Sequence, residues 1–206
     1  MVDELRYLAG FVRGGLAPLL RQALGEATLA DVLARWARAS PGAPALQVGE
    51  HLLDAAELVR ASRGAAEFLA RQGARSGDVV ALVGRNSVAY VALLLGAAQS
   101  GVTLALVHPE LSGEPLRHAL AAAHAERIVC EQALAASIAS SSELPQAAFD
   151  AEARQPFGWS GVGPGFDPAR KSRDLALVYT SGTTGLPKAC RLPHTRVLAA
   201  AAAFFR

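Results

Sequence analysis

A loop rich in glycine and hydroxyl side chains is the segment best suited to chemistry. Its nine residues are Thr180-Ser181-Gly182-Thr183-Thr184-Gly185-Leu186-Pro187-Lys188. Glycines let the backbone turn sharply and approach a ligand closely, and successive N–H groups in such a turn form a concave anion site. The hydroxyl groups add donors, and Lys188 adds a mobile positive charge. We therefore predict a phosphate-binding loop.

The alternative for such a segment is a solvated polar turn, and the complete nine-residue pattern argues against it. The loop is also distinct from the GxxxxGK[ST] phosphate loop of GTPases and kinases. Gly185 lies only three residues before Lys188, and Ala189 follows the lysine. Lys188 is one of only two lysines in a chain whose other basic residues are arginine. Its compact ammonium differs chemically from the planar fork of an arginine.

Strands and helices alternate along the chain and must position this loop. Hydrophobic periodicity predicts the strands 45–48, 79–83, 102–107, 128–130 and 175–179. The expected helices are 1–24, 28–40, 54–72, one from Asn86 to Gln99, one from Pro115 to about His124, and one from His194 to Arg206. The pattern indicates an α/β fold with a largely parallel sheet flanked by helices.

Helix ends and breaks can also be predicted. Thr28 is expected to cap the second helix, with Asp31 as its capping-box acid, and Asn86 is expected to cap a later helix that Gly101 ends. Residues 141–173 hold several prolines and glycines and little periodicity, so we expect a long irregular connection there.

Composition excludes several classes of function. The chain has 206 residues, 51% of them hydrophobic and 18% charged, with a net charge of +2. This suits a globular core and gives no reason to expect a nucleic-acid partner. The two cysteines are far apart and form no CxxC pair, which argues against a disulfide framework and fits a cytoplasmic location. The apolar helix expected at 1–24 leaves open a peripheral contact with a membrane.

Other reactive side chains give weaker signals. His118, His124 and Cys130 have no common zinc-binding spacing, so we expect no metal site. Cys130 fits a structural thiol at a strand end better than a nucleophile. His194, at the start of the last helix, could cap that helix or face the loop.

The segment YTSGTTGLPKA, residues 179–189, resembles the phosphate-loop signature of the adenylate-forming superfamily. This superfamily comprises acyl-CoA synthetases, luciferases and peptide-synthetase adenylation domains. Residues 77–120 and 28–46 also resemble that family. The GEPLRHAL sequence at 113–120 and the Lys188-Ala189-Cys190 sequence look most like the fatty-acid transport protein branch, also called very-long-chain acyl-CoA synthetases. Residues 51–62 and 107–111 depart from the family pattern.

The resemblance implies a two-step reaction. A carboxylate attacks the α-phosphate of Mg-ATP to give acyl-AMP and pyrophosphate, and coenzyme A then displaces AMP to form a thioester. ATP, Mg²⁺, a fatty or other carboxylic acid and coenzyme A are thus the expected ligands. Thr180, Ser181, Gly182, Thr183, Thr184, Gly185 and Lys188 would hold the phosphates, with Lys188 as the catalytic residue.

The resemblance also implies that residues 28–206 are an incomplete AMP-binding domain, preceded by a helical extension at 1–27. The adenine, acyl and metal sites of the family lie after the phosphate loop, so we expect these 206 residues alone to be inactive. Three possibilities stay open: a ligase fragment, a non-catalytic nucleotide-binding or interaction module, and a membrane-associated component of fatty-acid uptake.

Overall fold

The computed structural model describes residues 28–158, 174–180 and 188–204. The predicted helix at 1–24 lies outside these ranges, and so do the loop residues 181–187. What can be established about the loop therefore concerns the two residues that flank it, Thr180 and Lys188.

A six-stranded sheet forms the centre of the structure, with the strand order β6-β5-β3-β4-β7-β8. The strands are β3 (Val79–Val83), β4 (Thr103–Val107), β5 (Arg127–Glu131), β6 (Gln146–Phe149), β7 (Asp174–Thr180) and β8 (Lys188–Pro193). All neighbours pair in parallel except β7 and β8, which are antiparallel. The expectation of a largely parallel sheet is confirmed.

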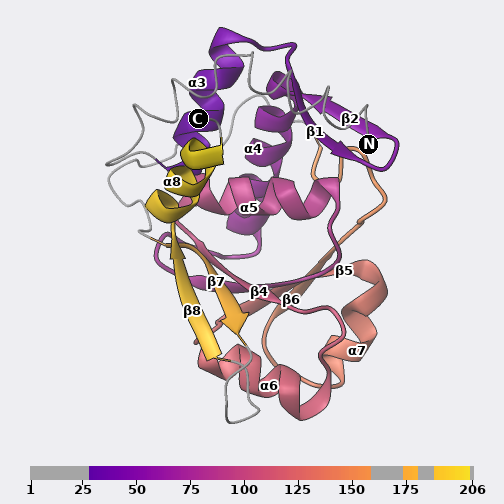
Figure 1. Cartoon of the computed structure of the whole chain (residues 1–206). Helices are drawn as coiled ribbons and strands as arrows, with labels where there is room; N and C mark the ends of the chain where they lie inside the picture. Colours follow the sequence, from indigo (N-terminus) through magenta and orange to yellow (C-terminus); the bar gives the residue numbers. More distant parts are fainter. Residues whose placement is uncertain (1–27, 159–173, 181–187, 205–206) are drawn as a thin grey trace.

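Helices cover both faces of the sheet (Figure 1). One layer holds α3 (Leu29–Ala39), α4 (Ala55–Arg71), α5 (Val88–Ser100) and α8 (His194–Phe204). The opposite layer holds α6 (Gly113–Ala122) and α7 (Ala135–Ala139), the latter preceded by the short 3₁₀ helix η1 (Gln132–Leu134). A separate hairpin of β1 (Pro44–Val48) and β2 (His51–Asp54) adjoins α4.

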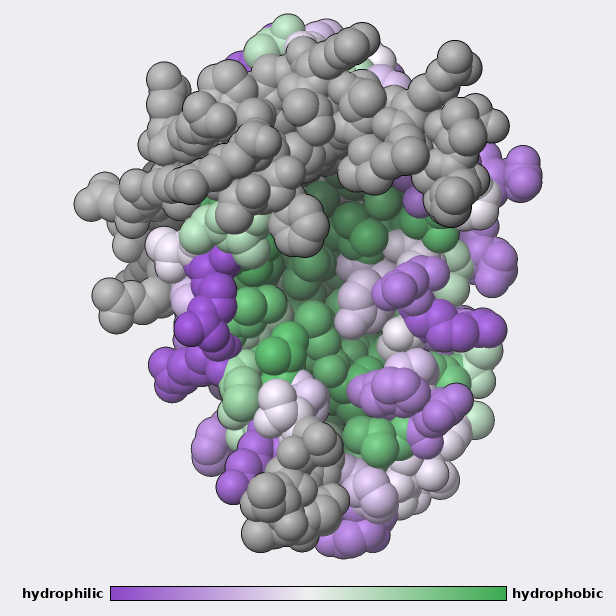
Figure 2. All heavy atoms as spheres, viewed as in Figure 1, coloured by the Kyte–Doolittle hydropathy of each residue, from purple (hydrophilic) through white to green (hydrophobic). Residues whose placement is uncertain are grey.

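The core lies between the sheet and these layers. Val80, Leu82, Leu93 and Leu104 have no exposed surface and pack together between the sheet and the α4–α5 layer. Apolar residues occupy nearly the whole circumference of α5, as expected of a helix that is buried on several sides. Figure 2, drawn in the view of Figure 1, shows hydrophobic side chains gathered in the middle of the visible surface, at the level of α5 and below it.

The second predicted helix begins as expected. The Thr28 hydroxyl accepts the Asp31 N–H at 3.2 Å, and the Asp31 carboxylate accepts the Thr28 N–H at 2.8 Å. The prediction that Asn86 caps α5 is wrong by one residue. The Ser87 hydroxyl accepts the Tyr90 N–H at 3.1 Å, which is one of the backbone N–H groups of the first turn that have no partner within the helix.

Three further predictions of elements need correction. Residues 141–173 include the strand β6, so they are not irregular throughout. The helix α6 begins at Gly113, which places Pro115 at its third position rather than its first. The strands β2 and β8 and the helix α7 were not predicted, because they are short or at the edge of a sheet and carry little periodicity.

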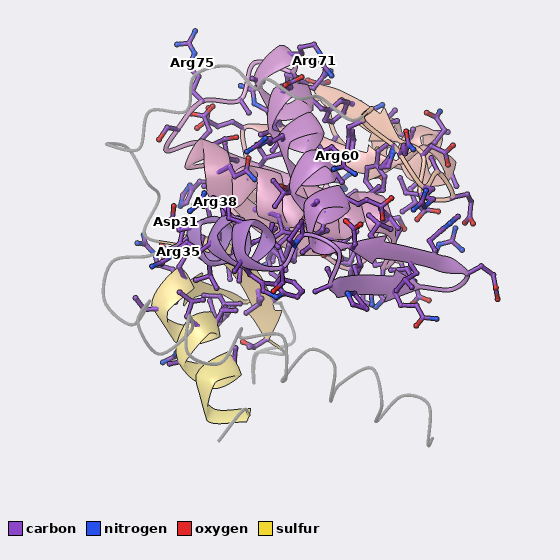
Figure 3. The ribbon with its side chains drawn as sticks, turned by 90° about the horizontal axis from the view of Figure 1, so that it is seen from above. Asp31, Arg35, Arg38, Arg60, Arg71 and Arg75 are labelled. Carbon is purple, nitrogen blue, oxygen red and sulfur yellow. The ribbon has the colours of Figure 1, made fainter. Side chains whose placement is uncertain are left out.

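Arginines mark the outer surface of the α3–α4 layer. Figure 3 shows Arg35 and Arg38 on α3, Arg60 and Arg71 on α4, and Arg75 in the loop before β3. Arg75 precedes β3, so it lies at the amino end of that strand, at the edge of the sheet opposite its carboxyl end. Among the described residues, no helix is long and apolar enough to cross a membrane.

Candidate functional site

The carboxyl ends of five parallel strands meet at one edge of the sheet. In sheets of this kind ligands bind at that edge, where connections from neighbouring strands depart to opposite faces. Here β3 leads into α5 on one face, and the adjacent β4 leads into α6 on the other. The edge between β3 and β4 is therefore the place where the topology itself opens a crevice.

A cavity of about 680 Å³ lies at this crevice. It is bordered by the residues that follow β3, by those that follow β4, and by the end of β7: Gly84, Arg85 and Asn86, then Val107, His108 and Pro109, then Tyr179 and Thr180. Its volume falls within the range of typical small-molecule pockets, roughly 300–1,000 Å³. The lining combines a guanidinium, an amide, an imidazole and hydroxyl groups.

The two described residues of the predicted phosphate loop lie at this same edge. Thr180 ends β7, Lys188 begins β8, and the two are paired partners across the antiparallel strands. Both side chains are exposed. The chain thus leaves the sheet at Thr180, beside the cavity, and returns opposite it at Lys188. Ser181, Gly182, Thr183, Thr184 and Gly185 fall outside the described residues.

Tyr179 fixes the end of β7 next to the cavity. Its hydroxyl donates a hydrogen bond to the Ala119 carbonyl on α6 at 2.7 Å. Burial raises the pKa of the Tyr179 phenol to about 12, so it stays a neutral donor at physiological pH. This contact holds the strand that leads into the loop against the helix beneath it.

Arg85 and Glu131 form an ion pair that sequence reasoning missed. Glu131 ends β5 and is only 3% exposed. One carboxylate oxygen accepts the Arg85 backbone N–H at 3.1 Å and its Nε–H at 3.2 Å, and the other accepts from Nη2. The hydrogen bond from Arg85 holds the pKa of Glu131 below its usual range, despite the opposing effect of burial. The sequence held one signal for this pair: Glu131 ends a buried strand, and Arg85 follows another.

Gly84 allows this strand end to be closely packed. A Cβ at this position would lie 2.8 Å from Phe149 Cζ and 3.4 Å from Glu131 Cβ. The absent side chain leaves room for Phe149 of β6, which is buried against the core. The backbone that presents Arg85 to the cavity is therefore confined by its neighbours.

His194 connects the starts of two helices. It is 4% exposed, and its Nδ1 accepts the Leu29 N–H at 3.3 Å. The acceptor satisfies one of the amide donors that the start of α3 leaves unpaired within the helix. His194 thereby attaches the start of α8 to the start of α3.

The two cysteines lie in contrasting environments. Cys130 is completely buried, and desolvation together with the Glu131 carboxylate raises the pKa of its thiol to about 11. This is the opposite of what a nucleophile needs, so the structure supports a structural thiol. Cys190 is exposed on β8, with its Sγ 3.7 Å from the Thr180 hydroxyl.

We expect one of the two thiols to react rapidly with a thiol reagent such as DTNB at pH 8. Cys190 should be labelled, and Cys130 only after denaturation, because burial hides its thiol and disfavours the thiolate. Cys190→Ser should remove the fast phase and Cys130→Ser should leave it. Rapid labelling of both thiols in the native protein would contradict the buried position of Cys130.

No group of three or more histidine, cysteine, aspartate or glutamate residues that could hold a metal ion occurs within residues 28–158, 174–180 and 188–204. His118 and His124 thus form no such group with other described residues. The features of the site are the cavity, the Arg85–Glu131 pair and the two ends of the loop.

The chain is similar in sequence to two proteins whose names refer to fatty acids. The bovine long-chain fatty acid transport protein 1 is 35% identical over 68% of this chain and 25% of its own length. The medium/long-chain-fatty-acid–CoA ligase FadD6 of Mycobacterium tuberculosis is 28% identical over 94% of this chain and 34% of its own. The chain thus spans about a quarter to a third of these two relatives.

Solved structures show the same fold. The structure of VinN with 3-methylaspartate superimposes with a TM-score of 0.70 at 24% identity, covering 87% of this chain and 51% of VinN. The family model described as "AMP-binding enzyme" matches residues 33–206, which include the whole candidate site. The chain therefore belongs to the AMP-binding enzyme family, the adenylate-forming superfamily.

Proposed function

We propose that this chain is the phosphate-binding, N-terminal part of an AMP-forming ligase that activates a fatty or related carboxylic acid. The observation that carries the proposal is the pairing of Thr180 with Lys188 at the carboxyl edge of the sheet, beside the cavity. Residues 28–206 would be the first part of one adenylation domain. In support of this, the chain aligns with only about a quarter to a third of the length of the two relatives.

In the proposed reaction a carboxylate oxygen attacks the α-phosphorus of ATP. The new O–P bond gives acyl-AMP, and the bond between the α- and β-phosphates breaks to release pyrophosphate. Thr180, Ser181, Gly182, Thr183, Thr184 and Gly185 would hold the β- and γ-phosphates through hydroxyl and backbone N–H groups. Lys188 would offset the negative charge that grows on the departing pyrophosphate. Mg²⁺ would accompany ATP and neutralise part of its charge.

In the second step the thiol of coenzyme A attacks the acyl carbonyl carbon and AMP leaves. The names of the two fatty-acid relatives support an aliphatic acid and coenzyme A as the substrates. The enzyme would be cytoplasmic. The name of the first relative, a fatty acid transport protein, supports a peripheral contact of this enzyme with membranes, into which such acids partition.

The test is thioester formation by the full-length enzyme with a panel of acids. Palmitate, octanoate, acetate, ferulate and aspartate are each supplied with ATP, magnesium and coenzyme A. We expect one or both fatty acids to give acyl-CoA and AMP with kcat/KM at least tenfold above the others, since each buried methylene contributes about 0.8 kcal/mol. Activity with aspartate alone would overturn the proposed substrate class and retain adenylation. AMP formation with none of the acids would overturn the proposed activity.

A further inference from the structure

The Arg85 guanidinium is held in one orientation by a buried carboxylate. Glu131 accepts the backbone N–H, the Nε–H and an Nη2 hydrogen of Arg85 through its two oxygens. The Glu131 side chain is 4% exposed, whereas that of Arg85 is 68% exposed. An exposed arginine normally samples many rotamers, but two hydrogen bonds from its guanidinium to one buried carboxylate remove most of that freedom.

This arrangement leaves donors directed away from Glu131. A guanidinium has five N–H donors in a planar fork. Glu131 takes those of Nε and one of Nη2, so three remain for another acceptor. Arg85 also lines the cavity, between Gly84 and Asn86. Its donors are therefore fixed at the wall of the pocket, in a geometry that matches two oxygens of a phosphate.

The electrostatic surroundings of Arg85 include two carboxylates. The hydrogen bond and charge of Glu131 raise the pKa of the guanidinium, and the more distant Glu152 adds to the effect. Both carboxylate oxygens of Glu131 accept hydrogen bonds from Arg85. His108, which directly follows β4, adds an imidazole to the lining of the cavity.

A purely structural explanation accounts for this pair less well. Burying a carboxylate costs free energy that its partner must offset, and an apolar pair of similar volume would hold two strand ends together at least as well. The pair gives something that an apolar pair cannot give, a positive charge at a fixed place on the cavity wall. Preorganised charges of this kind bind anions without a further loss of side-chain entropy.

We propose that Arg85 binds a phosphate group of a substrate in this cavity and that Glu131 is the residue that positions it. The inference rests on the proposed function, which supplies two phosphate-bearing substrates. The phosphate belongs either to the polyphosphate of ATP or to the nucleotide part of coenzyme A. Both present the same oxyanion to the guanidinium, and binding measurements separate them.

The test is equilibrium dialysis of the 206-residue protein with ATP, with coenzyme A and with pyrophosphate, each alone. Arg85→Gln should weaken binding of at least one of them by roughly tenfold to a hundredfold, as expected for loss of a charge-assisted bidentate contact. Arg85→Lys should restore part of the loss. A loss confined to ATP and pyrophosphate identifies the polyphosphate, and a loss confined to coenzyme A identifies its phosphates.

Further variants separate binding from folding. Arg85→Gln leaves Glu131 buried without its partner, so the double variant Arg85→Gln/Glu131→Gln replaces both charges with amides that can pair. It should melt close to the wild type and still bind weakly. Glu131→Gln alone should weaken binding less than Arg85→Gln does. Added salt should reduce affinity less in Arg85→Gln than in the wild type, because screening acts on the charge that was removed.

The matched control is Arg75→Gln. Arg75 is exposed (Figure 3), and because it precedes β3 it lies at the opposite edge of the sheet. Its contact to Asp78 uses the backbone N–H. This variant should bind every ligand as the wild type does. Unchanged binding in Arg85→Gln beside weakened binding in Lys188→Ala would overturn this inference alone. Binding of none of the three ligands by the wild type would overturn the inference, whereas the proposed function is tested separately by thioester formation in the full-length enzyme.

Discussion

Replacing Lys188 by alanine in the full-length enzyme should slow carboxylate-dependent ATP–pyrophosphate exchange by about a hundredfold. Lys188 is exposed at the start of β8 and opposite Thr180, so its side chain contributes little to packing. Its removal should change the free energy of unfolding by no more than about 0.5 kcal/mol. The large effect on rate arises because the ammonium would act on charge that develops as pyrophosphate departs.

Two companion variants sharpen this prediction. Lys188→Arg should recover only part of the rate, because a planar fork does not reproduce a compact ammonium at a tight turn. Arg75→Gln, which removes an exposed positive charge at the opposite edge of the sheet, should leave the exchange rate unchanged. Normal exchange by Lys188→Ala would show that the lysine has no part in adenylation. A fall in melting temperature large enough to explain the lost activity would make its role structural.

Gly96→Ala should destabilise the protein by roughly 2 kcal/mol, although alanine favours helices more than glycine by about 1 kcal/mol. Gly96 lies where α5 crosses α4. A Cβ there would lie 2.7 Å from both the Ala66 nitrogen and the Ser62 oxygen, and 2.9 Å from Ala65 Cβ. Two of these neighbours are backbone atoms of a helix, so the two helices must separate to admit the methyl group.

Chemical denaturation measures this effect, with Gly42→Ala as the control. A Cβ on Gly42 would meet no atom within 4 Å, and its backbone needs no left-handed conformation. That variant should be neutral or slightly stabilised, since alanine restricts the unfolded chain. Equal stability of Gly96→Ala and the wild type would mean that α4 and α5 are less closely packed than the structure shows.

The sequence predicts those parts of the fold that depend on local patterns. The strand 79–83 is apolar throughout and was located to the residue, because burial on both faces leaves a continuous hydrophobic run. The capping box at Thr28 and the left-handed Gly101 at the end of α5 follow from side-chain chemistry within a few residues. Asn86 and Ser87 are adjacent and both can cap, which explains the error of one residue.

Features that depend on distant contacts could not be predicted. The hydrogen bond between His194 and Leu29 spans 165 residues, and the Arg85–Glu131 pair spans 46. Each requires the order of strands in the sheet, which a single sequence does not contain. The phosphate loop was predicted from composition and spacing, and its role stays a prediction. The cavity beside it was not, because its wall comes from three strands that are separate in sequence.

The most direct test of the account follows one oxygen atom through the reaction of the full-length enzyme. A fatty acid labelled with ¹⁸O in its carboxylate is converted in the presence of ATP, magnesium and coenzyme A, and the products are analysed by mass spectrometry. Attack on the α-phosphorus followed by release of AMP predicts one ¹⁸O in AMP and none in pyrophosphate. Label in inorganic phosphate, with ADP as the nucleotide product, would contradict adenylation and the role proposed here for the Thr180–Lys188 loop.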